Sequence, residues 1–148
     1  MTDLHTCADV TFLALCIWRE ARGAPLEAQA GVACSILNRV DRPSWWGRSI
    51  TEVLFKRWQY SSITAPGDPQ LTTWPGTRDP WWAQCLTVAR DAIEGRLPNP
   101  VPGADSYYDL SIPPPKWATA ETFVKQIGRL RFYNVDRDVE VCAHPVRA

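Results

Sequence analysis

The sequence carries no net charge, because its 148 residues include 16 basic and 16 acidic side chains. This balance provides neither a basic patch for nucleic acid nor an attraction to an anionic membrane surface, so neither is expected as a partner. Histidine is also scarce, and His5 and His144 lie near opposite ends of the chain. We therefore expect no metal site and no cofactor.

Paired cysteine spacing is missing, although the chain has five cysteines: Cys7, Cys16, Cys34, Cys85 and Cys142. Without a CxxC motif, a disulfide or metal framework is not expected. The first three cysteines lie in apolar helical surroundings, which predicts small buried side chains. Free thiols of this kind suit synthesis in a reducing cytoplasm.

Long apolar runs are missing as well. The run from Val10 to Trp18 is too short to span a bilayer, so we expect no stable membrane insertion. The first residues include Asp3 and lack the basic start of a signal peptide, so we expect no secretion signal.

Tryptophan, in contrast, is abundant, with eight residues that include the adjacent pairs Trp45-Trp46 and Trp81-Trp82. Tryptophan side chains dominate the packing of many cores. Their flat rings also stack on the apolar faces of sugars. Core packing and ligand contact both remain open for these pairs.

The length suits one domain, residues 1–148, and apolar spacing with helix-capping residues predicts a mainly helical α+β fold. We predict helices over residues 7–22, 25–40, 49–55 and 80–94. Gly23 is the expected end of the first helix, and Pro25 the expected first residue of the second. Ser49 and Asp79 are the expected N-caps of the third and fourth helices.

The second helix has an apolar stripe that begins at Leu26, and a face of small residues around Gly31. Small residues permit close approach, so we expect another helix to pack there. Residues 106–109 and 130–135 are aromatic and β-prone, which predicts a small β-ribbon.

The remaining segments are expected to be loops or extended chain. Residues 56–77 read as a long loop with one ordered element at 58–62, and such loops are often functional. Residues 112–117 are rich in proline and should be extended. The tail after residue 136 should be loosely ordered.

Glu20 is the most informative residue, because it ends an apolar helical stretch just before the break at Gly23-Ala24-Pro25. A carboxyl group there is well placed to face a cleft, partly desolvated and with a raised pKa, as a general acid requires. The alternative is a structural ion pair with a neighbouring arginine. Arg19, Arg22 and Arg39 are the candidates.

An ordered set of motifs surrounds Glu20. Glu20-Ala21-Arg22-Gly23 is followed by the helix from Gly31 to Val40, with its Leu-Asn-Arg-Val ending. Later motifs are Gln59-Tyr60-Ser61, Ala89 to Gly95, Gly103 to Tyr107, Pro115-Lys116-Trp117 and Ile127 to Tyr133. From about residue 10 to 135, this order resembles the SleB/CwlJ family of cell-wall hydrolases, which includes spore-cortex-lytic enzymes and phage endolysins.

The resemblance implies a lysozyme-like, lytic-transglycosylase-like fold that cleaves peptidoglycan glycan strands between N-acetylmuramic acid and N-acetylglucosamine. Glu20 matches the family's single acid, which acts first as acid and then as base. The sequence departs from the family twice, with Leu130 in place of a histidine and Ala24 in place of a glutamate. Any role that those two side chains play in other members is either absent here or carried by other residues.

The other candidate site residues are polar or aromatic. The amide of Gln59 can donate and accept, which suits an N-acetyl group, and it lies beside two further polar residues. The candidate substrate-binding residues are Gln59, Tyr60, Ser61, Tyr107, Tyr108 and Trp117. A structural role remains open for each of them.

Two rival functions remain open. A hydrolytic muramidase would need a second acid, for which Asp105 and Asp109 are candidates by position. A non-catalytic peptidoglycan-binding module is the other rival. The favoured setting is a monomeric phage endolysin, made in the host cytoplasm without a signal peptide and released to the cell wall or periplasm by a holin. A bacterial enzyme exported by another route and a phage tail lysin are the alternatives.

Overall fold

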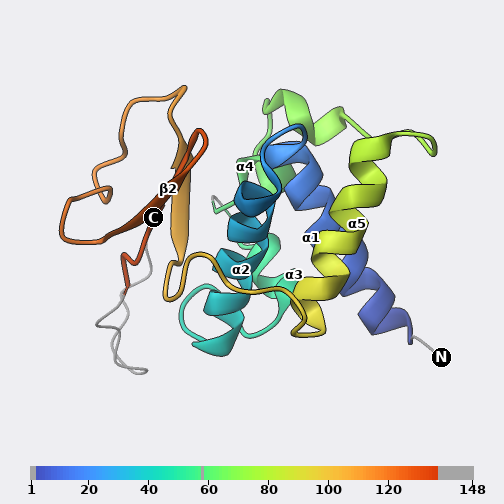
Figure 1. Cartoon of the computed structure of the whole chain (residues 1–148), viewed down its shortest axis with the longest axis horizontal. Coiled ribbons are helices and arrows are strands. Elements are labelled where there is room, and N and C mark those ends of the chain that lie inside the picture. The colour runs from blue at the N-terminus through green and yellow to red at the C-terminus, as the bar shows by residue number, and fades with distance from the viewer. Residues whose placement is uncertain (1–2, 58, 137–148) are drawn as a thin grey trace.

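The computed structural model describes residues 3–57 and 59–136, in which a group of helices lies beside a small sheet (Figure 1). The helices of these residues are α1 (Leu4–Ala21), α2 (Leu26–Asp41), α3 (Ile50–Leu54), α4 (Ser61–Thr64), the 3-10 helix η1 (Pro69–Thr72) and α5 (Pro80–Ile93). The strands are β1 (Ser106–Asp109), β2 (Phe123–Ile127) and β3 (Leu130–Tyr133). The predicted mainly helical α+β fold is confirmed.

α1 is the central helix, since its residues from Leu13 to Arg19 are buried against α2, α3 and α5. The Asp3 side chain caps the helix by accepting from the Thr6 N–H at 2.7 Å. Gly23, with a φ of 77°, follows the last turn as predicted. The prediction for Cys7 was wrong, because this thiol lies exposed near the start of the helix.

α2 differs from its prediction in three ways. Pro25 is its N-cap, one residue before the helix begins. Leu26 is 56% exposed, because the buried face of the first turn starts at Ala28. At Gly31 the small-residue face receives the ring of Phe132 from β3, in addition to the helices α1 and α5 that pack on α2. A Cβ atom at Gly31 would lie 2.7 Å from Phe132 Cζ, so only glycine fits without a shift.

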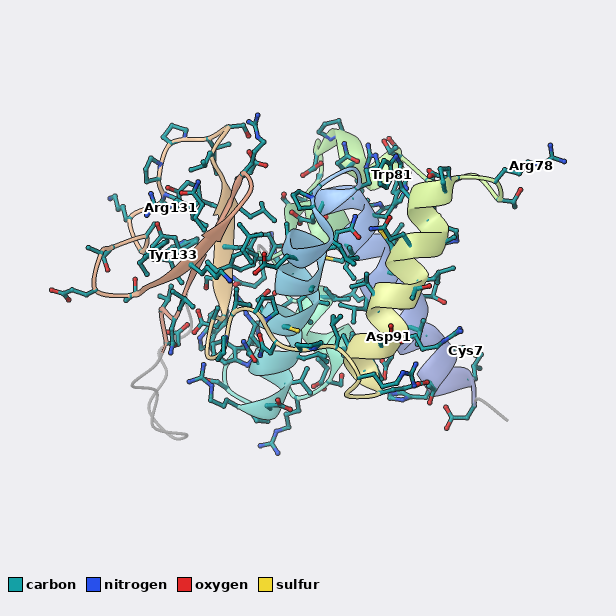
Figure 2. All side chains as sticks on the ribbon, viewed as in Figure 1. Cys7, Arg78, Trp81, Asp91, Arg131 and Tyr133 are labelled. Atoms are coloured by element: carbon teal, nitrogen blue, oxygen red, sulfur yellow. The ribbon has the colours of Figure 1, made fainter. Side chains whose placement is uncertain are left out.

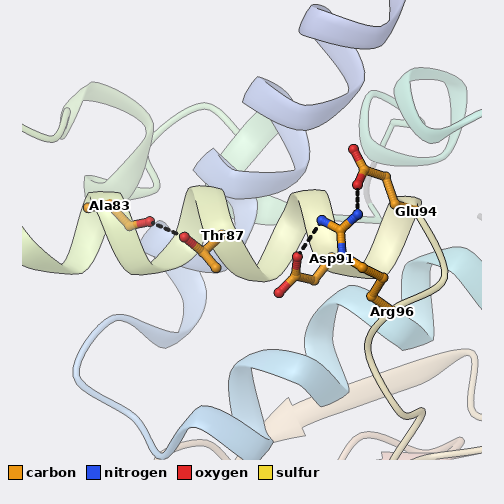
Figure 3. Close-up of polar contacts among 5 residues, drawn as sticks. All are labelled: Ala83, Thr87, Asp91, Glu94 and Arg96. Atoms are coloured by element: carbon orange, nitrogen blue, oxygen red, sulfur yellow. Dashed lines mark hydrogen bonds and ion pairs between the residues drawn. The ribbon is translucent and has the colours of Figure 1, made fainter.

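α5 begins where its capping residues predict. Asp79 Oδ1 accepts from the Trp81 N–H at 2.9 Å, and Asp79 Oδ2 accepts from Trp18 Nε1 at 3.0 Å. The cap therefore also fastens α5 to α1. Beyond the other end of α5, Arg96 donates to Asp91 and Glu94 on the molecular surface (Figure 3).

The segment between α3 and α5 is more ordered than the sequence predicts, because it contains α4 and η1. Asp68 caps η1 by accepting from the Gln70 N–H at 2.8 Å. Ser49 caps α3 as predicted. The predicted element at residues 58–62 overlaps α4, but Trp58 lies outside the described residues.

β1 and β3 form the predicted antiparallel ribbon, with Tyr107 opposite Phe132. β2 pairs with the other side of β3, which gives the strand order β1-β3-β2. β2 was missed because its Phe-Val-Lys-Gln-Ile sequence mixes polar and apolar residues, and most of its side chains lie at the surface. The sheet packs on α2 through β2 and β3 (Figure 1).

Three further predictions concern segments with no regular structure or no description. Residues 112–117 contain neither helix nor strand, but the predicted extended segment ends early, because residues 116 and 117 form a turn in which the Ala118 N–H donates to the Pro115 carbonyl oxygen at 3.0 Å. The predicted tail, Cys142 and His144 lie outside the described residues. Within residues 3–57 and 59–136, no helix combines the length and apolarity needed to cross a membrane.

Candidate active site

Glu20 lies in the last turn of α1, one residue before the helix ends at Ala21. The backbone of Arg22 is extended and Gly23 adopts a positive φ, so the chain turns away directly after the carboxyl group. The Glu20 side chain is half-buried and lines a cleft of about 430 Å³. The end of a buried helix thus places the Glu20 carboxyl group at the cleft wall.

The cleft lies where the helices meet the sheet, and it brings together residues that are far apart in the sequence. All seven residues predicted for the site line it: Glu20, Gln59, Tyr60, Ser61, Tyr107, Tyr108 and Trp117. Their chemical roles stay predictions. Their common location makes one glycan-binding surface geometrically possible.

Burial raises the pKa of Glu20 to about 7, because desolvation disfavours the carboxylate relative to the neutral acid. The carboxylates of Asp68 and Asp109 raise it further, whereas the hydroxyls of Ser62 and Tyr107 lower it. Ser62 Oγ donates to Glu20 Oε1 at 3.0 Å. Near neutral pH the carboxyl can therefore hold or release a proton, as an acid that later acts as a base requires.

The arginines that could have paired with Glu20 are used elsewhere in the described structure. Arg19 and Arg22 donate to backbone carbonyls, and Arg22 also donates to a glutamine side chain. Arg39 Nε donates to the carbonyl oxygen of Asp105 at 2.6 Å. No arginine among the described residues forms a salt bridge with Glu20, and burial is the largest influence on its pKa.

Aromatic rings form much of the cleft wall. The ring of Tyr107 lies 6.4 Å from that of Tyr60 and 5.5 Å from that of Phe132. The ring of Tyr108 lies 6.2 Å from that of Trp117. Adjacent strand residues point to opposite faces of the sheet, so Tyr107 packs with Tyr60 and Phe132, whereas Tyr108 packs with Trp117 and Tyr133. These residues combine packing with exposure to the cleft, so the two interpretations of their role are compatible.

The two candidate second acids lie in different surroundings. The carboxylate of Asp105 is buried and accepts from the backbone N–H groups of residues 135 and 136, which is a structural role. Asp109 lines the cleft. Partial burial opposes its ionisation, but the Ser111 N–H and Arg129 hold the pKa of Asp109 below its usual range. Only Asp109 is placed to act on a ligand in the cleft.

Several cleft residues were missed or underrated from the sequence. Ser62, which bonds Glu20, directly follows Gln59-Tyr60-Ser61, and that adjacency was the available signal. Arg39 lines the cleft, where its guanidinium lies over the rings of Trp45 and Tyr60. Arg39 also has a structural role, because its Nε donates to the backbone carbonyl oxygen of Asp105.

In each of the two tryptophan pairs, one ring packs in or against the core and the other is placed differently. Trp46 is buried in the core, while Trp45 lines the cleft. Trp81 is 42% exposed at the start of α5, on the helical side of the molecule and away from the sheet (Figure 2). Trp82 packs against the core. Sequence adjacency alone could not separate these neighbours.

The departures from the family pattern can also be placed. Leu130 lines the cleft, so the family's histidine position is apolar here. Ala24 packs against the core. Within the part of the chain that the structure describes, no three histidine, cysteine or acidic side chains gather as metal ligands.

Residues 23–133 match the family model described as Cell Wall Hydrolase. The chain belongs to the cell wall hydrolase family. This confirms the SleB/CwlJ resemblance. The match begins at Gly23, after Glu20, so the case for Glu20 depends on the geometry and electrostatics given above.

Two spore cortex-lytic enzymes are similar to this cell wall hydrolase domain. The protein from Halalkalibacterium halodurans is 28% identical over 126 residues, which are 85% of this chain and 34% of that protein. The protein from Bacillus subtilis is 29% identical over 121 residues, 82% of this chain and 36% of that protein. The chain thus spans about a third of the length of these curated relatives.

Two solved structures share the fold. The catalytic domain of the germination-specific lytic transglycosylase SleB from Bacillus anthracis matches with a TM-score of 0.69 and 24% identity, over 90% of this chain and 99% of that chain. The catalytic domain of Bacillus cereus SleB matches with a TM-score of 0.66 and 26% identity, over 84% and 88%. The predicted lytic-transglycosylase-like fold is confirmed.

Proposed function

We propose that this cell wall hydrolase cleaves the glycan strand of peptidoglycan between N-acetylmuramic acid and N-acetylglucosamine, with Glu20 as the acid–base residue. The observation that carries the proposal is the state of Glu20. Its carboxyl group lines the cleft, has a pKa of about 7 and is bonded to Ser62 without a salt bridge among the described residues. Membership of the family and the SleB-like fold support the substrate class.

The proposed reaction is that of a lytic transglycosylase. Glu20 donates its proton to the glycosidic oxygen as the bond to the muramoyl C1 breaks and N-acetylglucosamine departs. The Glu20 carboxylate then takes the proton of the muramoyl 6-hydroxyl, whose oxygen closes on C1 to form a 1,6-anhydro ring. The nucleophile belongs to the substrate, so one carboxyl suffices, and acid–base help of this kind contributes about 10²–10⁴-fold.

A hydrolytic muramidase is the second candidate, and Asp109 is the observation that favours it. This carboxylate shares the cleft with Glu20 and is stabilised in its ionised form. An ionised acid opposite a protonated one is the arrangement that glycosidases use to activate water or stabilise positive charge at C1. The two reactions differ in their products, so product analysis separates them.

The experiment is digestion of purified sacculi by the wild type and by Glu20→Gln, followed by mass spectrometry of the released muropeptides. The proposal predicts products one water lighter than hydrolysis products, and none with Glu20→Gln. Reducing-end products from the wild type would replace the transglycosylase with the hydrolase. No release from several wall types by a folded wild type would leave the peptidoglycan-binding module as the better interpretation.

The proposal extends to the setting of a monomeric phage endolysin that a holin releases to the wall. The four described cysteines are free thiols, which suits synthesis in a reducing cytoplasm. Expression inside a bacterium should cause lysis only when a holin or a membrane-permeabilising agent is added. Lysis or export without such a helper would contradict this setting.

A further inference from the structure

Arg19, the neighbour of Glu20 on α1, holds a separate segment of the chain in place. Its Nη1 donates to the Ser62 carbonyl oxygen at 2.9 Å, its Nη2 to that of Leu71 at 3.2 Å and its Nε to that of Thr73 at 3.2 Å. Only 7% of Arg19 is exposed. A buried guanidinium with three carbonyl acceptors is fixed in both position and direction.

These three carbonyls lie at the two ends of residues 62–73, a segment that includes most of α4 and all of η1. One guanidinium therefore closes the segment into a loop fastened to the last turns of α1. The ring of Trp74 covers the guanidinium, with Arg19 Cζ 4.5 Å from the ring centroid. The position of α4 relative to α1 thus depends on Arg19.

Ser62 connects this loop to the carboxyl group. Its carbonyl is held by Arg19, and its Oγ donates to Glu20 Oε1 at 3.0 Å. Ser62 is 3% exposed, so water does not readily replace this bond. Among the described residues no donor lies within hydrogen-bonding distance and angle of Glu20 Oε2. The Tyr107 hydroxyl, which also favours the ionised form of Glu20, is buried without a hydrogen-bond partner among them.

We propose that Arg19 and Ser62 are positioning residues that determine which oxygen of Glu20 carries the transferable proton. A hydroxyl donor prefers the carbonyl oxygen of a neutral carboxyl group, because that oxygen is the better acceptor. With Ser62 donating to Oε1, the proton resides on Oε2. Arg19 acts through Ser62, because it holds the backbone from which the hydroxyl projects. The inference rests on the proposed acid–base role of Glu20.

Other titratable groups face Glu20 from the elements packed around it, and each remains present in the variants below. They are the Cys16 thiol on α1, the Tyr60 hydroxyl at the start of α4, the Asp68 carboxylate before η1, and Tyr107 and Asp109 on β1. Asp68 and Asp109 favour the neutral form of Glu20, and the Tyr107 hydroxyl favours the ionised form. A change confined to the Ser62 hydroxyl therefore isolates the contribution of its hydrogen bond to the pKa of Glu20.

The test is an NMR titration of the Glu20 side-chain carboxyl in the full chain, for the wild type and three serine variants. Ser62→Ala should raise the pKa of Glu20 by about half a unit to one unit, because the carboxylate loses a donor. Ser62→Thr should restore the wild-type value, since it keeps the hydroxyl. Ser61→Ala, which removes the neighbouring hydroxyl, should leave the pKa unchanged. An unchanged pKa in a folded Ser62→Ala protein would overturn the proposal.

Arg19→Lys tests the second residue of the pair. Lysine keeps the positive charge but lacks the planar guanidinium that donates to the three carbonyl oxygens. It should raise the pKa of Glu20 in the same direction as Ser62→Ala. The double variant should add nothing to Ser62→Ala, since both changes act through one hydrogen bond. If the pKa shifts of the two single variants add in the double variant, or if Arg19→Lys causes no shift, Arg19 has no part in positioning the hydroxyl. The role of Ser62 would then depend on the Ser62 variants alone.

Cleavage of a soluble glycan oligomer separates this inference from the proposed function. Ser62→Ala should lower kcat about tenfold with little change in KM, and Ser62→Thr should recover most of the loss. A wild type that fails to cleave would refute the proposed function. The NMR titration would still show whether Arg19 and Ser62 control the pKa of Glu20. An active wild type with an unaltered rate in Ser62→Ala would refute the positioning role alone.

Discussion

At the scale of the residue, Glu20 combines a desolvated carboxyl group with a hydroxyl donor, and the result is a pKa of about 7. As the proton donor, Glu20 must be protonated when substrate binds. We therefore predict that kcat/KM falls as pH rises through about 7, since the active fraction of free enzyme declines. A pH profile on soluble glycan checks this. A kcat/KM that stays constant up to pH 9 would contradict this prediction.

The same raised pKa affects stability. The folded state binds the Glu20 proton more tightly than the unfolded state, whose carboxyl titrates near the ordinary value of 4.5. Stability is therefore greatest below this value and falls as pH rises to about 7. Glu20→Gln has no proton to lose at this position. The free energy of unfolding of the variant, relative to that of the wild type, should therefore increase by about 1–3 kcal/mol between pH 4 and pH 8. Urea denaturation at both pH values measures this growth, and a constant difference would contradict it.

At the scale of the element, α2 meets the sheet through Gly31 and the Phe132 ring. Gly31→Ala should destabilise the fold by about 1–3 kcal/mol, because its Cβ would lie 2.7 Å from Phe132 Cζ. Alanine normally favours a helix by about 1 kcal/mol, so a loss has the opposite sign to helix propensity. Gly76→Ala is the control, since nothing lies within 4 Å of its Cβ position. Denaturant unfolding of both variants measures the two changes in stability. If Gly31→Ala is as stable as Gly76→Ala, the close packing of Gly31 against Phe132 is contradicted.

The cap of α5 gives a second prediction at this scale. Asp79→Ala removes the acceptor of both the Trp81 N–H and Trp18 Nε1, and should cost about 1–3 kcal/mol. Asp3→Ala, which removes a single exposed cap bond at α1, should cost about 1 kcal/mol or less. Thermal unfolding of the two variants gives the comparison. An equal loss would mean that the bond from Trp18 contributes nothing.

At the scale of the whole molecule, the cleft has walls from both the helices and the sheet. A glycan bound to inactive Glu20→Gln should therefore slow amide hydrogen exchange in two separate regions, residues 59–64 and 106–117. The exposed surface around Arg96 (Figure 3) should show no protection. Protection of one region alone would mean that the glycan contacts only one wall of the cleft.

Much of this architecture could be predicted because it depends on neighbours within four residues. The spacing of apolar residues, the Asp79 cap and the Gly23 turn are local features, and they located α1, α2 and α5 to within a few residues. Glu20 was found in the same way, from its position at a helix end and from a family motif. Leu26 shows the limit of this approach, because its exposure depends on which face of α2 meets the rest of the molecule.

The sequence by itself determined α1, α2, α3 and α5, the β1–β3 ribbon, the family and the residue proposed to transfer the proton. Only the tertiary structure decided that Ser62, 42 residues away, bonds Glu20, and that Asp109 and not Asp105 lines the cleft. It also decided that β2 completes the sheet. The physical reason is that burial and long-range hydrogen bonds depend on how distant segments pack, and no local pattern specifies that packing. The raised pKa of Glu20 arises from this packing.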